Sequence, residues 1–338
     1  MENVSVVIPT YNRAALLRRT IETVIQGTTP EDEIIVVDDG STDETSQVPT
    51  EFKRKVRYIP IPNGGAGAAR NAGVGAATHD LIGFADSDDE WMPRRLDQQR
   101  PLMESRRDLV FSFTDFGQLF PDGHIEKNWL QAWHHDRRPW DEILGPGQPC
   151  SELAPLANGV ADVTVHMGSM YLRLLHAGYV NVNTLLVRRS LAGDQLHFGL
   201  ELPTWEDYEC SARIARMGRC AYLDIDTALQ RAHSGPRLTD ADKIQVAKAH
   251  LEVISRVWAA DGACVRDHCR EINAVKEQLH KILARRYLVR EQFDQARLSA
   301  AKLEHLHLES ALLWLPSPIL SSALKLYRTT RKLLHAQS

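Results

Sequence analysis

The first 115 residues alternate short apolar runs with helical patterns, and this alternation constrains the fold more than any other feature of the sequence. The apolar runs Val4–Ile8 and Glu33–Asp38 are expected strands, separated by the amphipathic pattern of Ala14–Gln26. Further strands are expected at Val56–Ile61, Leu81–Ala85 and Leu109–Asp115, and further helices at Ala66–Ala77 and Glu90–Ser105. Such alternation predicts an α/β fold with an open, mostly parallel sheet flanked by helices.

The rest of the chain changes character twice. Phe120–Asn183 is irregular and rich in Trp, His, Pro and Gly, which is typical of loops that bind or cover a ligand. Ala221–Asp226 is strand-like, and beyond about Thr239 the pattern is helical. We therefore expect a sheet-based domain over residues 1–238, with halves of about 1–115 and 116–238, and a helical region over 239–338.

Composition excludes some partners. Forty Lys and Arg residues against forty-four Asp and Glu give a net charge of -4, whereas nucleic-acid binding needs a clustered basic excess. The five cysteines form no CxxC pair, which is typical of reduced thiols. No apolar stretch reaches the roughly 18–20 residues of a spanning helix, and no basic, apolar leader precedes Val4. We expect a cytoplasmic protein that binds no nucleic acid.

Two aspartates directly follow the expected strand Leu81–Ala85. Alternate side chains of an extended segment face the same way, so Asp86 and Asp88 can direct two carboxylates to one point. Carboxylate oxygens suit Mg²⁺ or Mn²⁺ that bridges a diphosphate. The structural alternative is an acidic turn that caps a helix beginning near Glu90, and Asp89 fits that role better than the metal role.

Three other strand ends carry polar or small residues. Pro9–Arg13 offers a hydroxyl, an aromatic face and a cation, and Asp38–Asp43 offers carboxylates, although Ser41 and Asp43 also suit a helix cap. Asn63–Gly67 is a Gly-rich turn that opens the helix bearing Arg70. Ligands of open α/β sheets bind beyond the carboxyl ends of the strands, so these ends are expected to share one site.

Two later features are also candidates. Trp205–Glu209 places three acids in the first turn of an expected helix, where the helix dipole favours them, but one of them could serve as a general base. His233 follows Ala221–Asp226 in a polar loop and is either structural or a ligand.

Together these segments resemble glycosyltransferase family 2, whose members have the GT-A nucleotide-sugar fold. The resemblance covers about residues 3–238. It rests on Val6–Arg13, Ile35–Asp43, Asn63–Gly65, Ala69–Asn71, Phe84–Asp89 and Glu206–Asp207. It implies a metal-dependent, inverting single displacement that moves a sugar from a nucleotide diphosphate, with UDP expected, to a glycan or lipid-linked acceptor. Surface polysaccharide or glycoconjugate synthesis of the bacterial type is the implied setting.

The resemblance also implies roles for individual residues. The donor would be bound by Pro9, Thr10, Tyr11, Arg13, Asp39, Asn63, Gly64, Arg70 and Asp86. Asp86 and Asp88 would form the metal-binding DxD motif for Mg²⁺ or Mn²⁺, with His233 as a further ligand, and Asp207 matches the catalytic base. Residues 1–115 would form the nucleotide-sugar half and 116–238 the acceptor half.

The sequence departs from the family's pattern in two respects, and two other classes of function remain as alternatives. The segment between Asp115 and Gly178 matches no familiar motif, and the absence of an Arg-Trp signature with following transmembrane helices favours a single-addition enzyme over a processive synthase. A sugar-nucleotide nucleotidyltransferase would need a Gly-rich, basic loop, but Pro9–Arg13 has no glycine. A binding module without turnover is the alternative outside enzymology, although Asp86, Asp88 and Asp207 are intact.

The C-terminal residues 311–335 form an apolar stretch with a Trp and then a basic amphipathic pattern. Such a helix can lie in a membrane interface. The alternative is packing on the preceding helices or on a second subunit of a homodimer.

Overall fold

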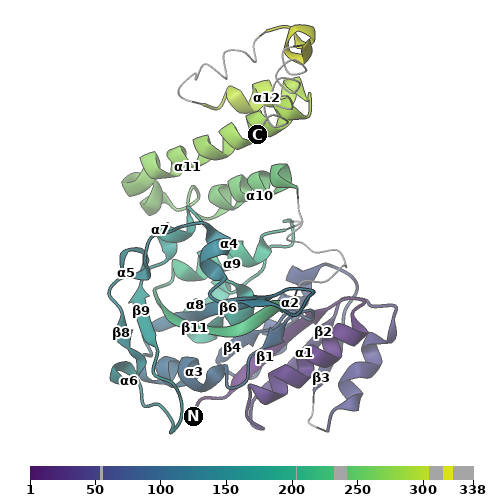
Figure 1. Cartoon of the computed structure of the whole chain (residues 1–338), viewed down its shortest axis with the longest axis vertical. Helices are drawn as coiled ribbons and strands as arrows, with labels where there is room; N and C mark the ends of the chain where they lie inside the picture. The colour runs from purple at the N-terminus through teal and green to yellow at the C-terminus, as the bar shows by residue number, and fades with distance from the viewer. Residues whose placement is uncertain (54–55, 203, 232–241, 304–314, 323–338) are drawn as a thin grey trace. The chain divides into compact units, whose positions relative to one another are not determined.

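The computed structural model describes residues 1–53, 56–202, 204–231, 242–303 and 315–322. The chain divides into two compact units, Met1–Gly235 and Pro236–Ser338 (Figure 1). The first unit is built on one mixed sheet, and the described part of the second is helical. The candidate site residues that the structure describes all belong to the first unit.

The sheet places the carboxyl ends of its main strands at one edge. Its path runs β3-β2-β1-β4-β10-β6-β11-β9-β8, with β5 and β7 paired to β11 and β6. The bounds are β1 Val4–Thr10, β2 Glu33–Asp38, β3 Arg57–Pro60, β4 Leu81–Phe84, β5 Glu90–Trp91, β6 Leu109–Leu119, β7 Ile125–Glu126, β8 Gln148–Pro149, β9 Thr164–Gly168, β10 Leu186–Arg188 and β11 Arg219–Arg231. Strands β1 to β4 are parallel, and β10 is antiparallel to both β4 and β6. Since β11 is parallel to β6, the carboxyl ends of β1, β2, β4, β6 and β11 share an edge.

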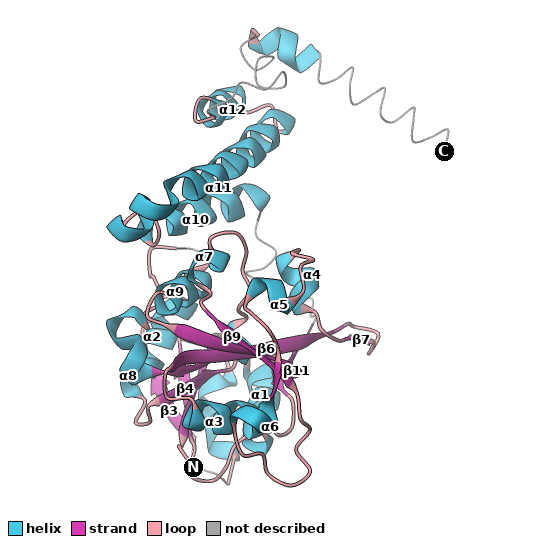
Figure 2. Cartoon of the chain, turned by 90° about the vertical axis from the view of Figure 1, so that its left-hand side faces the viewer, coloured by secondary structure: helices cyan, strands magenta, loops and turns pink. Residues whose placement is uncertain are grey.

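Helices flank this sheet and connect its strands. The helices of the first unit are α1 Ala14–Gln26, α2 Ala66–Ala76, α3 Leu96–Ser105, α4 Leu130–His134, α5 Trp140–Ile143, α6 Cys150–Leu153, α7 Tyr171–Leu174, α8 Arg189–Ala192 and α9 Glu206–Ala215. Three 3-10 turns are η1 Glu44–Glu51, η2 Val182–Thr184 and η3 Gly193–Gln195. Figure 2 shows α1, α3 and α6 on one side of the sheet and α9 on the other.

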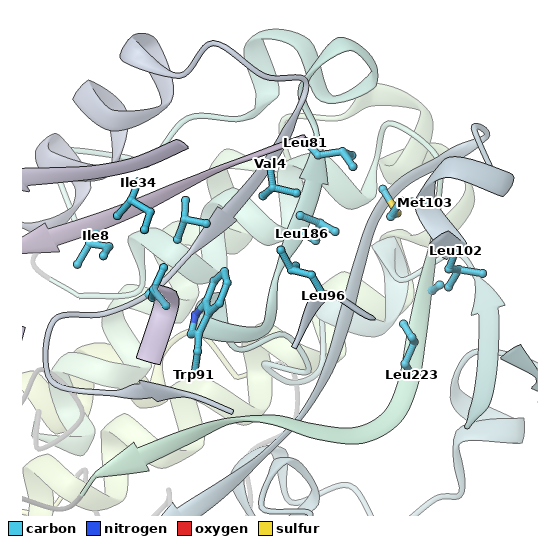
Figure 3. Close-up of a cluster of buried hydrophobic side chains, with 14 of the residues drawn as sticks. Val4, Ile8, Ile34, Leu81, Trp91, Leu96, Leu102, Met103, Leu186 and Leu223 are labelled. Atoms are coloured by element: carbon cyan, nitrogen blue, oxygen red, sulfur yellow. The ribbon is translucent and has the colours of Figure 1, made fainter. Parts of the chain in front are cut away.

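The core explains which helix covers which face. Alternate residues of β1, Val4 and Ile8 among them, pack with Leu96 of α3 and with the apolar stripe of α1 in one fully buried cluster (Figure 3). Val7 points to the opposite face, where α2 approaches so closely that a Cβ on Gly73 would lie 2.3 Å from Val7 Cγ1. A strand buried on both faces needs this continuous apolar sequence.

The predicted α/β sheet with flanking helices is confirmed, but one helix begins later than expected. Residues 90–105 were expected to be helical throughout, whereas Glu90 and Trp91 form β5 against β11 and the helix begins at Leu96. Trp91 is buried, and its indole N–H donates to the carbonyl of Phe84. Arg94 then adopts a left-handed φ of 63°, which interrupts any helix before α3.

The alternative in which Asp89 caps a helix beginning near Glu90 is therefore wrong, because β5 follows this residue directly. Its carboxylate instead accepts hydrogen bonds from the side chain of Asn183 and the backbone N–H of Arg231. Asp43, which the sequence also suited to a helix cap, does cap a turn, since its carboxylate accepts from the backbone N–H of Thr45 at the start of η1.

The irregular middle segment contains more structure than its sequence pattern indicates. Strand β6 continues to Leu119, beyond the expected end at Asp115, and β11 spans thirteen residues from Arg219. These two long strands pair in parallel with register shifts. Short elements between residues 120 and 183 then extend the sheet through β9 and β8.

The second unit contains α10 Lys243–Arg256, α11 Gly262–Val289 and α12 Phe293–Ala300, and α11 has a kink at His268. Within the described ranges, no helix has both the length and the apolar character needed to cross a membrane. Most of residues 311–335 lies outside the described residues, so membrane contact through this stretch stays a prediction, as does the homodimer.

Candidate active site

The two aspartates after β4 both bind arginines. Asp86 Oδ1 accepts from Arg70 Nη2 at 2.7 Å, and Asp88 Oδ2 lies 2.5 Å from Arg13 Nη1. The side chain of Asp86 is 25% exposed and that of Asp88 is 15% exposed, so a ligand can reach both carboxylates. The turn after β4 therefore presents two accessible carboxylates at the edge where β1, β2 and β6 also end.

A buried amide fixes the shape of this turn. Asn183 Oδ1 accepts from the backbone N–H of Asp86 at 2.6 Å, and Asn183 Nδ2 donates to Asp89 at 2.6 Å. Because Asp89 also accepts from the backbone N–H of Arg231 at 3.0 Å, it joins the turn to the end of β11. Asn183 carries no local signal in the sequence, because it lies in an irregular segment 97 residues from Asp86.

Arg70 connects the turn to the helix that bears the expected base. This guanidinium is almost fully buried and donates to Glu206 Oε1 through Nη1 at 2.8 Å, as well as to Asp86. It also lies 5.4 Å from the ring centroid of Phe198. Burial alone would lower the pKa of Arg70, but the carboxylates of Asp86 and Glu206 raise it above its ordinary value, so the side chain stays cationic. We call Arg70, Asp86 and Glu206 the Arg70 network.

Asp207 follows Glu206 in the first turn of α9 and is half-buried. Burial and, second, the negative charge of Glu206 raise the pKa of Asp207 to about 6, while the Arg70 guanidinium acts in the opposite direction. The residue before the helix, Trp205, has a left-handed φ of 74° and packs its ring edge-on against Tyr208. A half-buried carboxylate with a pKa of about 6 can accept a proton from a hydroxyl.

The second strand end forms a separate group around Asp39. Its buried carboxylate accepts from the backbone N–H groups of Gly64 and Gly65 at 2.7 and 2.8 Å. The side-chain amide of Asn63 donates to the Asp39 carbonyl, and the Asp39 N–H donates to the Thr10 carbonyl. These bonds hold the carboxyl ends of β1 and β2 against the N-terminus of α2. Gly65, the residue before α2, adopts a φ of 87°, a conformation that favours glycine.

The residues at the end of β1 differ in what they offer. Pro9 is buried, and its backbone is paired with Val37 in the sheet. The Thr10 hydroxyl is buried and has no hydrogen-bond partner among the described residues, whereas Tyr11 is 47% exposed. A buried hydroxyl without a partner needs an explanation in a native structure, and a ligand bound at this strand end would supply one.

A divalent cation fits part of this arrangement. Asp86 and Asp88 supply hard oxygen ligands from a single turn, and each already attracts a cationic side chain. The described residues contain no cluster of three or more His, Cys, Asp or Glu side chains placed to hold a metal. His233, the expected further ligand, lies outside the described residues.

Comparisons with known proteins agree with the resemblance in sequence. Residues 5–144 match the model of glycosyl transferase family 2. The succinoglycan biosynthesis protein ExoO of Rhizobium meliloti is 28% identical over 345 residues, which cover 99% of this chain and 89% of that protein. An Escherichia coli relative, the UDP-Glc:alpha-D-GlcNAc-diphosphoundecaprenol beta-1,3-glucosyltransferase WfaP, is 34% identical over 38% of this chain and 49% of its own length.

The structural comparison supports the fold. The chain resembles the crystal structure of S. aureus TarS 1-349 in complex with UDP-GlcNAc, with a TM-score of 0.59 at 18% identity over 99% of this chain and 92% of that one. Three other curated relatives, all glycosyltransferases by name, are matched over only 20–52% of their own length.

The burial of Arg70 generates a prediction about stability. Arg70→Met would leave Glu206 and Asp86 without their cation, and breaking a buried ion pair in this way typically costs about 3–5 kcal/mol. We expect a loss of this size in the free energy of unfolding, measured by urea denaturation, with partial recovery in Arg70→Met/Glu206→Gln.

Arg18→Met is the matched control, because Arg18 pairs with Glu51 on the surface, where both side chains are 42% exposed. Its effect is expected to be much smaller. Equal losses in Arg70→Met and Arg18→Met would contradict the importance assigned to the Arg70 network.

Proposed function

We propose that this chain is a family 2 glycosyltransferase that transfers a sugar from a UDP-sugar to a hydroxyl of a glycan or lipid-linked acceptor, with inversion at the anomeric carbon. The observation that best supports this proposal is the Arg70 network, which joins Asp86, the first carboxylate of the proposed DxD motif, to the helix turn that bears Asp207. The UDP donor is supported by the UDP-GlcNAc complex of TarS and by the UDP-Glc donor named for the E. coli relative.

In this proposal Asp207 is the general base. The acceptor hydroxyl oxygen attacks the anomeric carbon, its proton passes to the Asp207 carboxylate, and the bond from the anomeric carbon to the diphosphate oxygen breaks. Attack from the face opposite the leaving group inverts the configuration. The raised pKa of Asp207 makes its carboxylate basic enough to take the proton while leaving it mostly ionised at pH 7.

The donor would lie along the shared sheet edge. We propose that Thr10, Tyr11 and Asp39 hold the base and ribose, together with the backbone around Pro9, Asn63 and Gly64. Arg13 would face the diphosphate. Arg70 already donates through both terminal nitrogens, so we propose that it acts on the phosphates through Asp86 rather than by direct contact.

A divalent cation, Mg²⁺ or Mn²⁺, would be held by Asp86 and Asp88, with His233 as a further proposed ligand. When bound, it would neutralise charge on the departing diphosphate. Because Arg13 lies 2.5 Å from Asp88, we propose that this arginine shares or gives up the carboxylate when donor and cation enter.

The function is tested by following UDP release from UDP-glucose and UDP-GlcNAc in the presence of Mn²⁺. We expect slow, Mn²⁺-dependent hydrolysis without added acceptor, and loss of Mn²⁺-dependent UDP affinity in Asp88→Ala by titration calorimetry, because one carboxylate does not replace a pair. Asp194→Ala is the control, since Asp194 is exposed and lies in η3. Unchanged UDP affinity in Asp88→Ala would refute the metal assignment, and absence of turnover with every UDP-sugar would favour a binding module.

The base assignment predicts a pH dependence and a mutant effect. A base works only when deprotonated, so kcat/KM should fall about tenfold per pH unit below a pKa of about 6.

Asp207→Asn should lower turnover by roughly 10²–10⁴-fold with donor affinity retained. The exposed Asp194→Asn serves as control. Near wild-type turnover in Asp207→Asn would move the base to another residue, with Glu206 the next candidate.

A further inference from the structure

We propose that a cavity between β7 and α4 binds a negatively charged sugar of the acceptor. This inference rests on the proposed function, because it assigns a class of acceptor to the same active site. The cavity has a volume of about 510 Å³, within the range of pockets that hold small ligands. It is lined by Glu126, Lys127, Asn128, Trp129, Gln131, Ala132, His135 and Arg137.

The topology places this cavity at the catalytic edge of the sheet. Strand β6 runs in the same direction as β4, so the hairpin from β6 into β7 leaves the sheet at the edge where Asp86 and Asp88 follow β4. Figure 2 shows β7 at the end of the long strands and α4 above the strands near that end. Along the strand order, β1 and β2 lie on one side of β4, whereas β6 lies on the other. The cavity is thus separated from the Asp39 group by the DxD turn.

An aromatic ring at this cavity is fixed by its own contacts. The backbone N–H of Trp129 donates to the carbonyl of Phe116 at 2.9 Å, and its ring packs edge-on against Phe120 with centroids 5.8 Å apart. The adjacent Asn128 has a left-handed φ of 53°, and its N–H donates to Asp226 at 3.1 Å. An indole that is held in place loses little conformational entropy when it packs against the apolar face of a sugar ring.

The charges around this ring favour an anion. Lys127, His135 and Arg137 are exposed, and none of them lies within 4.0 Å of a carboxylate oxygen among the described residues. Glu126 is the single acidic side chain in the lining, and its carboxylate lies 3.9 Å from His124 Nε2. Asp226, outside the lining, accepts from the Asn128 N–H and attracts Lys127, so His135 and Arg137 are the basic side chains left to meet an anion. Lys and Arg donate strong, charge-assisted hydrogen bonds to carboxylates and phosphates. The lining therefore fits a uronate or a sugar phosphate better than a neutral sugar.

The proposal is tested by ligand-observed saturation-transfer NMR on the full chain, with the donor site saturated by UDP and the diamagnetic Mg²⁺. The probes are methyl β-glucuronide, N-acetylglucosamine 1-phosphate and the neutral methyl β-glucoside. We expect the two anionic probes to bind more tightly than the glucoside. Trp129→Ala and Arg137→Gln should each weaken anionic binding roughly tenfold, while the control Arg107→Gln, which is exposed and follows α3, has no effect.

Titration of UDP with Mn²⁺ into the same variants keeps the outcomes distinguishable. UDP affinity should be unchanged in Trp129→Ala and Arg137→Gln, which also reports that they are folded. If wild-type protein fails to bind UDP, the proposed function fails, while the pocket is still tested with the anionic probes alone. Equal affinity for the glucoside and the anionic probes, or wild-type probe binding in Arg137→Gln, would overturn the anionic-sugar pocket.

Discussion

The rest of the site depends on one buried cation, Arg70. Its guanidinium binds two carboxylates that are distant in sequence, since Glu206 lies 136 residues away and Asp86 lies 16 away. Removing a charge from water is costly, and this cost is offset only if the partners are held in good geometry. The packing of α2 against α9 supplies that geometry, because a Cβ on Gly67 would lie only 3.3 Å from Glu206 Cγ. The position of the helix turn that bears Asp207 is therefore linked to the turn that contains Asp86.

The sheet makes this linkage possible. Val7 on one face of β1 packs against α2, while Val4 and Ile8 on the other face pack with α1 and α3, so the strand is held from both sides. With β4 parallel to β1, the turn that contains Asp86 emerges from this rigid centre. A few further hydrogen bonds then define the positions of the aspartates at the strand ends. Asn183 binds the backbone N–H of Asp86, and two glycine N–H groups bind the carboxylate of Asp39.

The sequence was sufficient to predict the α/β sheet and the strand ends that carry Asp39, Asp86 and Asp88, because these depend on local apolar runs and on the direction of parallel strands. It did not predict β5, where tertiary pairing with β11 prevents a helix. Nor did it indicate Asn183 or the pairing of Arg70 with Glu206, since such contacts join segments about 100 residues or more apart and leave no local pattern. Local patterns therefore identified candidate side chains, whereas their partners required the fold.

The Arg70 network sets the charge around Asp207, the proposed catalytic base, and the pH dependence of kcat/KM in Glu206→Gln tests this most directly. Glutamine can still accept a hydrogen bond from Arg70 but carries no negative charge. The negative charge of Glu206 raises the pKa of Asp207, so its removal should move the acidic limb of the profile from about 6 to lower pH. A limb that stays in place, or that moves to higher pH, would contradict the account.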